Sequence, residues 1–487
     1  MTGATGLLGG YLVRDCARYR LPLAVVARAS RRESAQQRIE SMLAGWEGRL
    51  GYALPRPVVL EGDLTQPFLG LNKEQVGWVR EHCSAVLHNA ASLSFVKTRD
   101  GEPFRSNVDG TRHVLELASA VGIRRFHHVS TAYVCGLREG TILESDLDVG
   151  QTPGNVYEES KIASEGLVAA SEFLDSPTVF RPGIIIGDSR TGFSSSFHGF
   201  YAPLRVALAM ADRVSDKGEV GQGYGREILQ LFQLSGDEAK NFVPVDWVSA
   251  VMTRVLANPE LQGRVYHLTP SNAITLQEMT QVMFDVVHVH GQKNRSIESG
   301  RAISRTSFER SFLDQLAVYK SYWRDDPIFD QKNTLEAVPD LPCPQVDREM
   351  LLRMCVYAIQ SGFGVPAPAP LVPEFDVAQH LSGSLERARI KDSTNSTGSG
   401  YLKVGLRVTG AGGGEWELET QQEHLLASHP GVSEGCETLL HLNSITFGKM
   451  VARQIDLEHA IRSGAILVEG KPADATRAVS VLRHIAS

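Results

Sequence analysis

TGATGLLGG (residues 2–10) stands at the start of the chain and leads into a helical pattern, YLVRDCARY (11–19). Glycines at positions 3, 6 and 9 let the backbone turn tightly and approach a pyrophosphate closely. The helix that follows such a turn offers free N–H groups and the positive end of its dipole. The stretch therefore predicts a dinucleotide-binding turn.

Outward from this turn, as far as about residue 290, short β-branched runs alternate with helical patterns. This alternation predicts βαβ units and an α/β fold with a Rossmann-type, doubly wound parallel sheet. The strand-like runs are LPLAVVAR (21–28), PVVLEGD (57–63), SAVLHNAA (84–91), RRFHHVSTAYV (124–134) and SPTVFRPGIIIG (176–187).

The N-terminus conflicts with this fold, because only Met1 precedes Thr2. A dinucleotide fold needs a strand directly before the glycine turn, and that strand is normally central in the sheet. Its loss would leave the neighbouring strands without a hydrogen-bonding partner. We therefore expect the natural chain to begin several residues upstream.

The chain divides into four predicted parts. Residues 1–290 form the dinucleotide-binding domain, and residues 291–363, rich in aromatics and proline, form a helical substrate or lid segment that packs on it. GVPAPAPLVPE (364–374) reads as a semi-rigid linker. Residues 375–487 form a small α+β domain, with a helix, two strands around a glycine turn and further α and β segments.

Composition excludes several classes of protein. The chain has 487 residues, a net charge of −7 and no dense Lys/Arg block, which argues against a nucleic-acid partner. No apolar run is long enough to span a bilayer. Six cysteines without CxxC or zinc spacing indicate free thiols in a reducing compartment, and no metal site is expected. These features favour a soluble cytoplasmic protein of undetermined oligomeric state.

Arg28 follows the second predicted strand, where an NAD-binding protein would carry an acidic residue. Arg31 and Arg32 lie close by in the sequence. A guanidinium suits the 2′-phosphate of NADPH, so NADPH is favoured over NADH, which stays possible. The alternative is a plain surface charge.

A second group of residues carries the chemistry. Ser130 and Thr131 end a predicted strand, and Tyr157 and Lys161 lie at i and i+4 of a predicted helix, on one face. An ammonium group beside a phenol lowers the pKa of the phenol, so that Tyr157 could exchange a proton near neutral pH. A strand-end hydroxyl could bond the same carbonyl oxygen. The alternative is an ordinary surface pair on a helix.

These motifs together resemble the extended short-chain dehydrogenase/reductase family over about residues 2–270. The resemblance rests on TGATGLLGG, HNAA (88–91), NVDGT (107–111), VSTAYV (129–134), YEESK (157–161) and FRPGIIIG (180–187). GDLTQPFLGL (62–71) and Arg28 more narrowly resemble the thioester-reductase branch, which includes fatty acyl-CoA reductases and terminal reductases of peptide and polyketide synthases.

The resemblance implies a role for each matching residue. Thr131, Tyr157 and Lys161 would be the catalytic triad, and Asn107 a structural or relay residue. The residues implied in binding the cofactor are Thr2, Gly3, Thr5, Gly6, Leu7, Leu8, Gly9, Arg28, Asp63, Leu64, Asn89, Ala90, Ala91, Tyr157, Lys161, Pro182 and Gly183.

Residues 375–487 resemble a sterol-carrier-protein-2-type domain, mainly through the final unit of strand, Glu-Gly and helix. Such domains often enclose an apolar cavity for lipids, so the resemblance implies a lipid-binding domain. The alternative is a dimerisation or stability module.

The implied function is NAD(P)H-dependent reduction of the carbonyl of an apolar substrate. An acyl thioester on CoA or an acyl carrier protein, reduced to the aldehyde or alcohol, is the first expectation. A ketone or quinone of a secondary metabolite is the second, and a non-catalytic protein that binds nucleotide and lipid is the third. The intact Thr-Tyr-Lys set argues against the third.

Overall fold

The computed structural model describes residues 1–211, 229, 233–291, 317–364, 375–391, 401–410, 412–421, 424–433, 435–436 and 438–486. The chain forms two compact units. One comprises Met1–Asp15, Ala24–Arg28 and Leu60–Pro368, and the other Cys16–Leu23, Ala29–Val59 and Ala369–Ser487. Residues 292–316 of the predicted lid and 365–374 of the predicted linker lie outside the described residues. The four predicted domain boundaries stay predictions.

A parallel sheet is the centre of the first unit. Four strands run in the order β10-β6-β4-β3 with parallel ladders, and β1 pairs with β2. Thr2 joins the two sheets through parallel bridges to Val26 and His88. The strands are β1 (Ala24–Ala27), β2 (Val58–Glu61), β3 (Ala85–His88), β4 (Arg125–Val129), β6 (Thr178–Pro182) and β10 (Val265–Leu268). The predicted doubly wound α/β fold is thereby confirmed.

Met1 and Thr2 occupy the central position of this sheet, between β1 and β3. The Met1 carbonyl accepts a hydrogen bond from Val26 N–H at 2.9 Å, and Thr2 N–H donates to the Leu87 carbonyl at 3.0 Å. The order is therefore that of a dinucleotide fold whose first strand is represented by these two residues. The expectation that the natural chain starts upstream stays a prediction.

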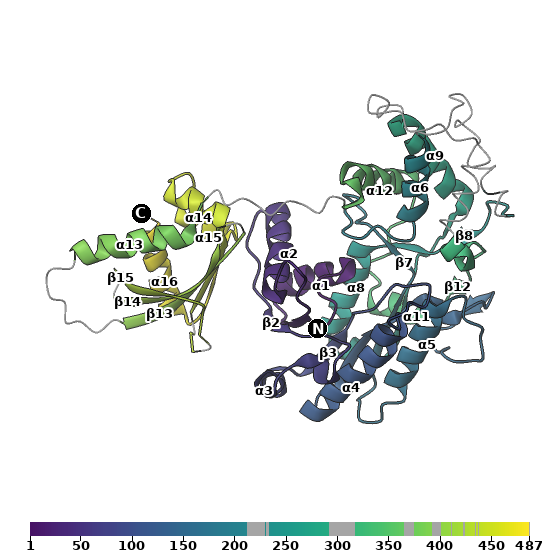
Figure 1. Cartoon of the computed structure of the whole chain (residues 1–487), viewed down its shortest axis with the longest axis horizontal. Helices are drawn as coiled ribbons and strands as arrows, with labels where there is room; N and C mark the ends of the chain where they lie inside the picture. Colours follow the sequence, from purple (N-terminus) through teal and green to yellow (C-terminus); the bar gives the residue numbers. More distant parts are fainter. Residues whose placement is uncertain are drawn as a thin grey trace. The chain divides into compact units, whose positions relative to one another are not determined.

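Helices cover both faces of the parallel sheet. Figure 1 shows α4 and α5 side by side against one face and α1 near α8 on the other. α4, for example, buries Val114, Leu117 and Val121, and Gly122, whose φ is 78°, caps its C-terminus. The helices are α1 (Leu7–Arg18), α3 (Lys73–His82), α4 (Gly110–Val121), α5 (Val156–Ala169) and α8 (Val245–Ala257).

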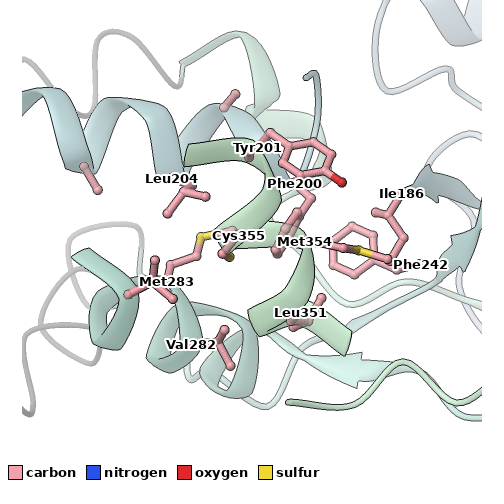
Figure 2. Close-up of a cluster of buried hydrophobic side chains, with 14 of the residues drawn as sticks. Ile186, Phe200, Tyr201, Leu204, Phe242, Val282, Met283, Leu351, Met354 and Cys355 are labelled. Atoms are coloured by element: carbon pink, nitrogen blue, oxygen red, sulfur yellow. The ribbon is translucent and has the colours of Figure 1, made fainter. Parts of the chain in front are cut away.

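A second hydrophobic core of the first unit lies among α6 (Tyr201–Ala211), α9 (Leu276–Gly291) and α12 (Arg348–Gln360). Figure 2 shows Leu204 of α6, Met283 of α9 and Cys355 of α12 close to one another, and Met354 of α12 beside the ring of Phe242. Two small ladders contribute residues to this core: β7 (Ile184–Ile186) with β9 (Phe242–Pro244), and β11 (Ile274–Thr275) with β8 (Ala239–Lys240). A third ladder, β12 (Ile328–Phe329) with β5 (Thr141–Ile142), belongs to a separate small cluster with Ala132 and Cys135.

Short helical turns complete the first unit. They are η1 (Pro67–Gly70), the π-helical η2 (Arg105–Asp109), η3 (Ala132–Cys135), η4 (Pro259–Leu261), η5 (Ala317–Tyr322), α11 (Lys332–Ala337) and η6 (Gly362–Gly364). No helix among the described residues is both long and apolar enough to cross a membrane.

The second unit contains a five-stranded sheet in the order β15-β14-β13-β16-β17. The two strands predicted around a glycine turn are β13 and β14, whereas β15, a short strand ending at Pro430, was not predicted. Its strands are β13 (Tyr401–Thr409), β14 (Gly414–Gln421), β15 (His424–Pro430), β16 (Leu439–Asn443) and β17 (Ile466–Glu469). Its helices are α2 (Ala35–Leu50), α13 (Val377–Lys391), α14 (Ser444–Val451), α15 (Leu457–Arg462) and α16 (Pro472–Ile485).

A buried carboxylate ties α2 to the sheet of the second unit. Glu47 is 1% exposed and accepts hydrogen bonds from Leu54 N–H at 2.8 Å, from the Arg56 guanidinium and from the Thr409 hydroxyl. A carboxylate can be buried at low cost only when such donors surround it. Buried hydrogen bonds therefore join residues that lie more than 300 positions apart in the sequence.

Candidate active site

The glycine turn has the geometry of a pyrophosphate cradle. Gly3 has φ 72°, and a Cβ on it would lie 2.7 Å from Ala90 N, while a Cβ on Gly9 would lie 1.9 Å from the Gly3 carbonyl oxygen. The nearest atom to a Cβ on Gly6 would be 3.5 Å away, so its outer face is open. α1 begins at Leu7, directly after this open position. A nicotinamide dinucleotide fits such a turn at a helix N-terminus.

Side-chain bonds join the glycine turn to the end of β3. The Thr2 hydroxyl accepts hydrogen bonds from Asn89 N–H and Ala90 N–H at 3.2 Å each. The Asn89 amide in turn donates to the Gly3 carbonyl at 3.2 Å. The structure thus brings together two motifs that lie more than 80 residues apart in the sequence.

The other residues implied in cofactor binding differ in their exposure. Leu8 lies in the core, so it could contact a ligand only through its backbone, whereas Thr5 and Leu7 are half-buried and Ala91 is exposed. Gly183 has no room for a side chain, since its Cβ would lie 2.4 Å from a backbone oxygen.

Arg28 and Asp63 meet at the carboxyl ends of β1 and β2. The Arg28 side chain is 68% exposed, and its Nη1 lies 4.0 Å from Asp63 Oδ2. Asp63 also accepts a hydrogen bond from Thr65 N–H at 2.9 Å, and the Leu64 carbonyl bonds the His113 ring at 2.8 Å. The positive charge of Arg28 is therefore exposed to solvent, near the carboxyl edge of the sheet, where nucleotides bind in such folds.

The predicted catalytic residues gather at the carboxyl ends of β4 and β6. Tyr157 and Lys161 lie one turn apart on α5, and the Lys161 ammonium donates to the Val129 carbonyl at 2.8 Å. The Thr131 hydroxyl donates to the carbonyl of Pro182 at 3.5 Å. One helix and two adjacent strand ends thus hold a phenol, an ammonium and a hydroxyl.

The electrostatics of this group differ from the prediction in one respect. Burial lowers the pKa of Lys161 to about 8. The pKa of Tyr157 is raised above its usual value by burial and by the neighbouring Glu158 carboxylate, so the predicted acidic phenol was wrong for this structure. The physical reason is that the ammonium binds the Val129 carbonyl and the ring is shielded from water. Tyr157 is therefore protonated at neutral pH and suited to donate its proton.

Two buried histidines, His88 and His128, lie close enough to Lys161 to feel its charge. Both ring nitrogens of His88 are bonded, to the Thr2 hydroxyl at 2.8 Å and the Thr111 hydroxyl at 2.9 Å, and burial lowers its pKa to about 3. Burial also holds the pKa of His128 well below its usual value, with the Lys161 charge as the next cause. Both rings are therefore neutral at physiological pH and bring no positive charge next to Lys161.

The Asn107 side chain connects the loop after β3 to α5. Its side-chain oxygen accepts from Ser92 N–H at 2.7 Å, and its amide donates to the Ser92 carbonyl and the Ser160 hydroxyl at 3.0 and 2.9 Å. The loop after β3 is thus tied to α5. This loop carries Phe95, whose ring centroid lies 5.8 Å from that of Tyr157, a neighbour that the sequence patterns did not reveal. The available signal was an aromatic residue in a loop that follows a strand end.

Comparison with protein families agrees with the fold and the glycine turn. Residues 1–252 match the model of an NAD-binding family described as male sterility protein. Among curated proteins of Aspergillus flavus, aldehyde reductase lnaA is 26% identical over 73% of this chain, and nonribosomal peptide synthetase asaC is 29% identical over 55%. The chain spans 35% of the first of these proteins and 26% of the second.

Solved structures with a similar fold include reductase domains. The terminal R domain from the myxalamid PKS-NRPS biosynthetic pathway superposes with a TM-score of 0.56 and 25% identity, covering 76% of this chain and 91% of that domain. A thiolation-reductase di-domain from an archaeal non-ribosomal peptide synthetase gives a TM-score of 0.53 at 19% identity, over 74% of this chain and 75% of that one. The second likeness concerns the fold alone.

Proposed function

Because this chain belongs to the NAD-binding family described as male sterility protein, we propose that it reduces an acyl thioester to the aldehyde or alcohol. The chain is an NAD(P)-dependent oxidoreductase of the extended short-chain dehydrogenase/reductase type. The observation that supports the proposal most is that a protonated Tyr157, Lys161 and Thr131 gather at the carboxyl edge of the sheet that also carries the glycine turn. The names of the relatives point to reductases of peptide and polyketide assembly.

The mechanism divides the work among three side chains. When bound, the reduced nicotinamide supplies a hydride to the thioester carbonyl carbon. Tyr157 gives its phenolic proton to the carbonyl oxygen as negative charge develops there, and the Thr131 hydroxyl donates a hydrogen bond to the same oxygen. Lys161, one turn further along α5, supplies the positive charge that offsets the phenolate once Tyr157 has given up its proton. The resulting hemithioacetal expels the thiol and leaves an aldehyde, and a second hydride would give the alcohol.

NADPH is the proposed form of the cofactor. The exposed guanidinium of Arg28 supports this, because it stands after β1, where the adenosine ribose binds in such folds. Arg28→Ala should weaken NADPH binding by about tenfold or more and NADH binding little, since a charge-assisted bond contributes about 1.5–3 kcal/mol. Titration of both cofactors by fluorescence measures this, and an equal loss for both would refute the assignment.

The thioester assignment is tested by following two products of one reaction. Purified enzyme with NADPH and a panel of acyl-CoA thioesters should oxidise NADPH and release CoA thiol in step. Oxidation of NADPH with ketones or quinones but without thiol release from any thioester would instead favour a carbonyl reductase of another metabolite class. A carrier protein charged with the preferred acyl group then tests the proposed carrier partner.

For the C-terminal residues 375–487 we propose binding of an apolar ligand, as in sterol-carrier-protein-2-type domains. The order of helix, strands and final helix supports this, together with an apolar core that includes Leu406, Leu440 and Phe447. Displacement of a fluorescent fatty acid from the full chain by lipids would test it, and a lack of uptake would refute it. The six free cysteines support residence in a reducing compartment such as the cytoplasm.

A further inference from the structure

A cluster of three aromatic side chains reaches the proposed catalytic tyrosine through Phe95. Phe95, Tyr319 and Tyr322, here called the aromatic wall, come from the loop after β3 and from η5. The ring centroid of Phe95 lies 5.8 Å from that of Tyr157 at an interplanar angle of 76°. The centroids of Tyr319 and Tyr322 each lie 5.4 Å from that of Phe95, with angles of 65° and 69°. These are edge-to-face contacts, the geometry that aromatic pairs prefer.

The loop side of the wall is fixed to the catalytic helix. Asn107 bonds both backbone groups of Ser92 and the hydroxyl of Ser160, which precedes Lys161 on α5. Phe95 follows Ser92 by three residues and is half-buried. Its ring is therefore held at a fixed distance from Tyr157.

The other side of the wall is fixed to the same helix and to the strand ends. The Asn155 amide, at the N-cap of α5, donates to the Ser321 hydroxyl at 3.1 Å. Asp326, buried, accepts from the Tyr133 hydroxyl at 2.6 Å and pairs with Lys240 at 2.8 Å. The segment that carries Tyr319 and Tyr322 is thus anchored at several points, and side chains on such supports can discriminate between ligands.

We propose that the aromatic wall makes the enzyme prefer thioesters whose acyl group carries an aromatic ring close to the carbonyl. This inference rests on the proposed thioester reduction. The carbonyl oxygen has to lie within hydrogen-bonding reach of the Tyr157 hydroxyl, which brings the acyl substituent close to the ring next to Tyr157. The arm of CoA or a carrier protein is rich in amides, so the acyl group is the part that suits an aromatic surface.

The size of the preference follows from aromatic contacts. An aromatic pair contributes about 0.5–1.5 kcal/mol beyond its buried area, which corresponds to roughly twofold to tenfold in kcat/KM. Phe95 is the specificity-determining residue in this scheme, because it contacts both Tyr157 and the rest of the wall.

The test compares two thioesters of equal carbon count, phenylacetyl-CoA and octanoyl-CoA, in the full-length enzyme with NADPH. The wild type should prefer phenylacetyl-CoA by about twofold to tenfold in kcat/KM, and Phe95→Leu should bring the ratio close to one. Val96→Ala is the matched control, since Val96 is on the same loop and 55% exposed, and it should keep the wild-type ratio. Phe95→Tyr, which keeps the ring, should also keep it.

The ratio is independent of how much of a variant folds, because both substrates are measured on one preparation. Equal use of both thioesters by the wild type, or an unchanged ratio in Phe95→Leu, would overturn the role of the wall and leave thioester reduction standing. Absence of thiol release from both thioesters would overturn the proposed function and the inference with it.

Discussion

Two buried charged groups, Glu47 in the second unit and Lys161 in the first, have opposite electrostatic surroundings. In the second unit, the Glu47 carboxylate is met by a guanidinium, a backbone N–H and a hydroxyl, so its charge is neutralised in place. In the first unit, the Lys161 ammonium is bonded to a neutral carbonyl and its pKa is lowered to about 8. A satisfied charge stabilises a fold, whereas a charge held at some energetic cost is available for chemistry. Substitutions in each unit should separate these two uses of a buried charge.

Removal of the Tyr157 hydroxyl should have the largest effect. Tyr157→Phe should lower kcat by about 10²–10⁴-fold, the usual contribution of a positioned acid, with cofactor affinity and stability almost unchanged. Steady-state kinetics and cofactor titration measure this. Tyr401→Phe makes the same change at a 54% exposed tyrosine of the second unit and should leave kcat unaltered. A Tyr157→Phe enzyme with near-normal kcat would remove the tyrosine from its role.

The corresponding change in the second unit should affect stability. Glu47→Ala removes the nearer of the two carboxylates that pair with the Arg56 side chain, which is 2% exposed, and leaves Glu40 at 3.4 Å. The loss of these buried hydrogen bonds should cost about 1–3 kcal/mol of unfolding free energy. Urea denaturation measures the loss. Glu458→Ala, at a pair whose two side chains are 64% and 72% exposed, should cost less than about 1 kcal/mol. Equal losses in the two variants would contradict the account of Glu47.

The features of the first unit that depend on local sequence patterns could be predicted from the sequence alone. The glycine spacing located the turn, and the alternation of strands and helices predicted the parallel sheet, because both follow from short-range geometry. The raised pKa of Tyr157 and its contact with Phe95 could not be predicted in this way. Burial and ring contacts between residues some 60 positions apart are set by tertiary packing, which leaves no periodic signal. The cofactor roles of the individual residues stay predictions.

Two glycines of the turn should separate folding from binding. Gly9→Ala places a Cβ 1.9 Å from the Gly3 carbonyl oxygen and should destabilise the first unit by about 1–3 kcal/mol. Gly6→Ala meets nothing closer than 3.5 Å and should leave stability within about 0.5 kcal/mol while it weakens cofactor binding. Thermal unfolding and cofactor titration of both variants measure this. Equal destabilisation would show that the outer face of the turn is not open.

The pH dependence of activity should reveal the titration of Lys161. Since the pKa of Lys161 is about 8, kcat/KM should fall above pH 8, by about tenfold at pH 9, as the ammonium loses its proton. Lys161→Arg should abolish this descending limb. The effect of pH on stability has the opposite direction. The pKa of Lys161 is lower in the folded protein than in the unfolded chain, so between these two values the unfolded chain binds more protons. The free energy of unfolding therefore rises as the pH increases through this range. A flat rate profile from pH 7 to 10 would exclude the lysine as the titrating group.

Thr2 joins two parts of the parallel sheet in the first unit. It is the residue whose bridges to Val26 and His88 connect the two halves of the parallel sheet, and its hydroxyl also holds Asn89 and Ala90 against the glycine turn. A coenzyme bound at that turn would therefore stabilise the junction between the two parts of the sheet. Because it binds the folded state, the unfolding free energy of the sheet would rise with coenzyme concentration. Amide hydrogens of β1 and β3 would then exchange with solvent more slowly in the loaded enzyme, so that the same threonine couples occupancy of the site to the continuity of its scaffold.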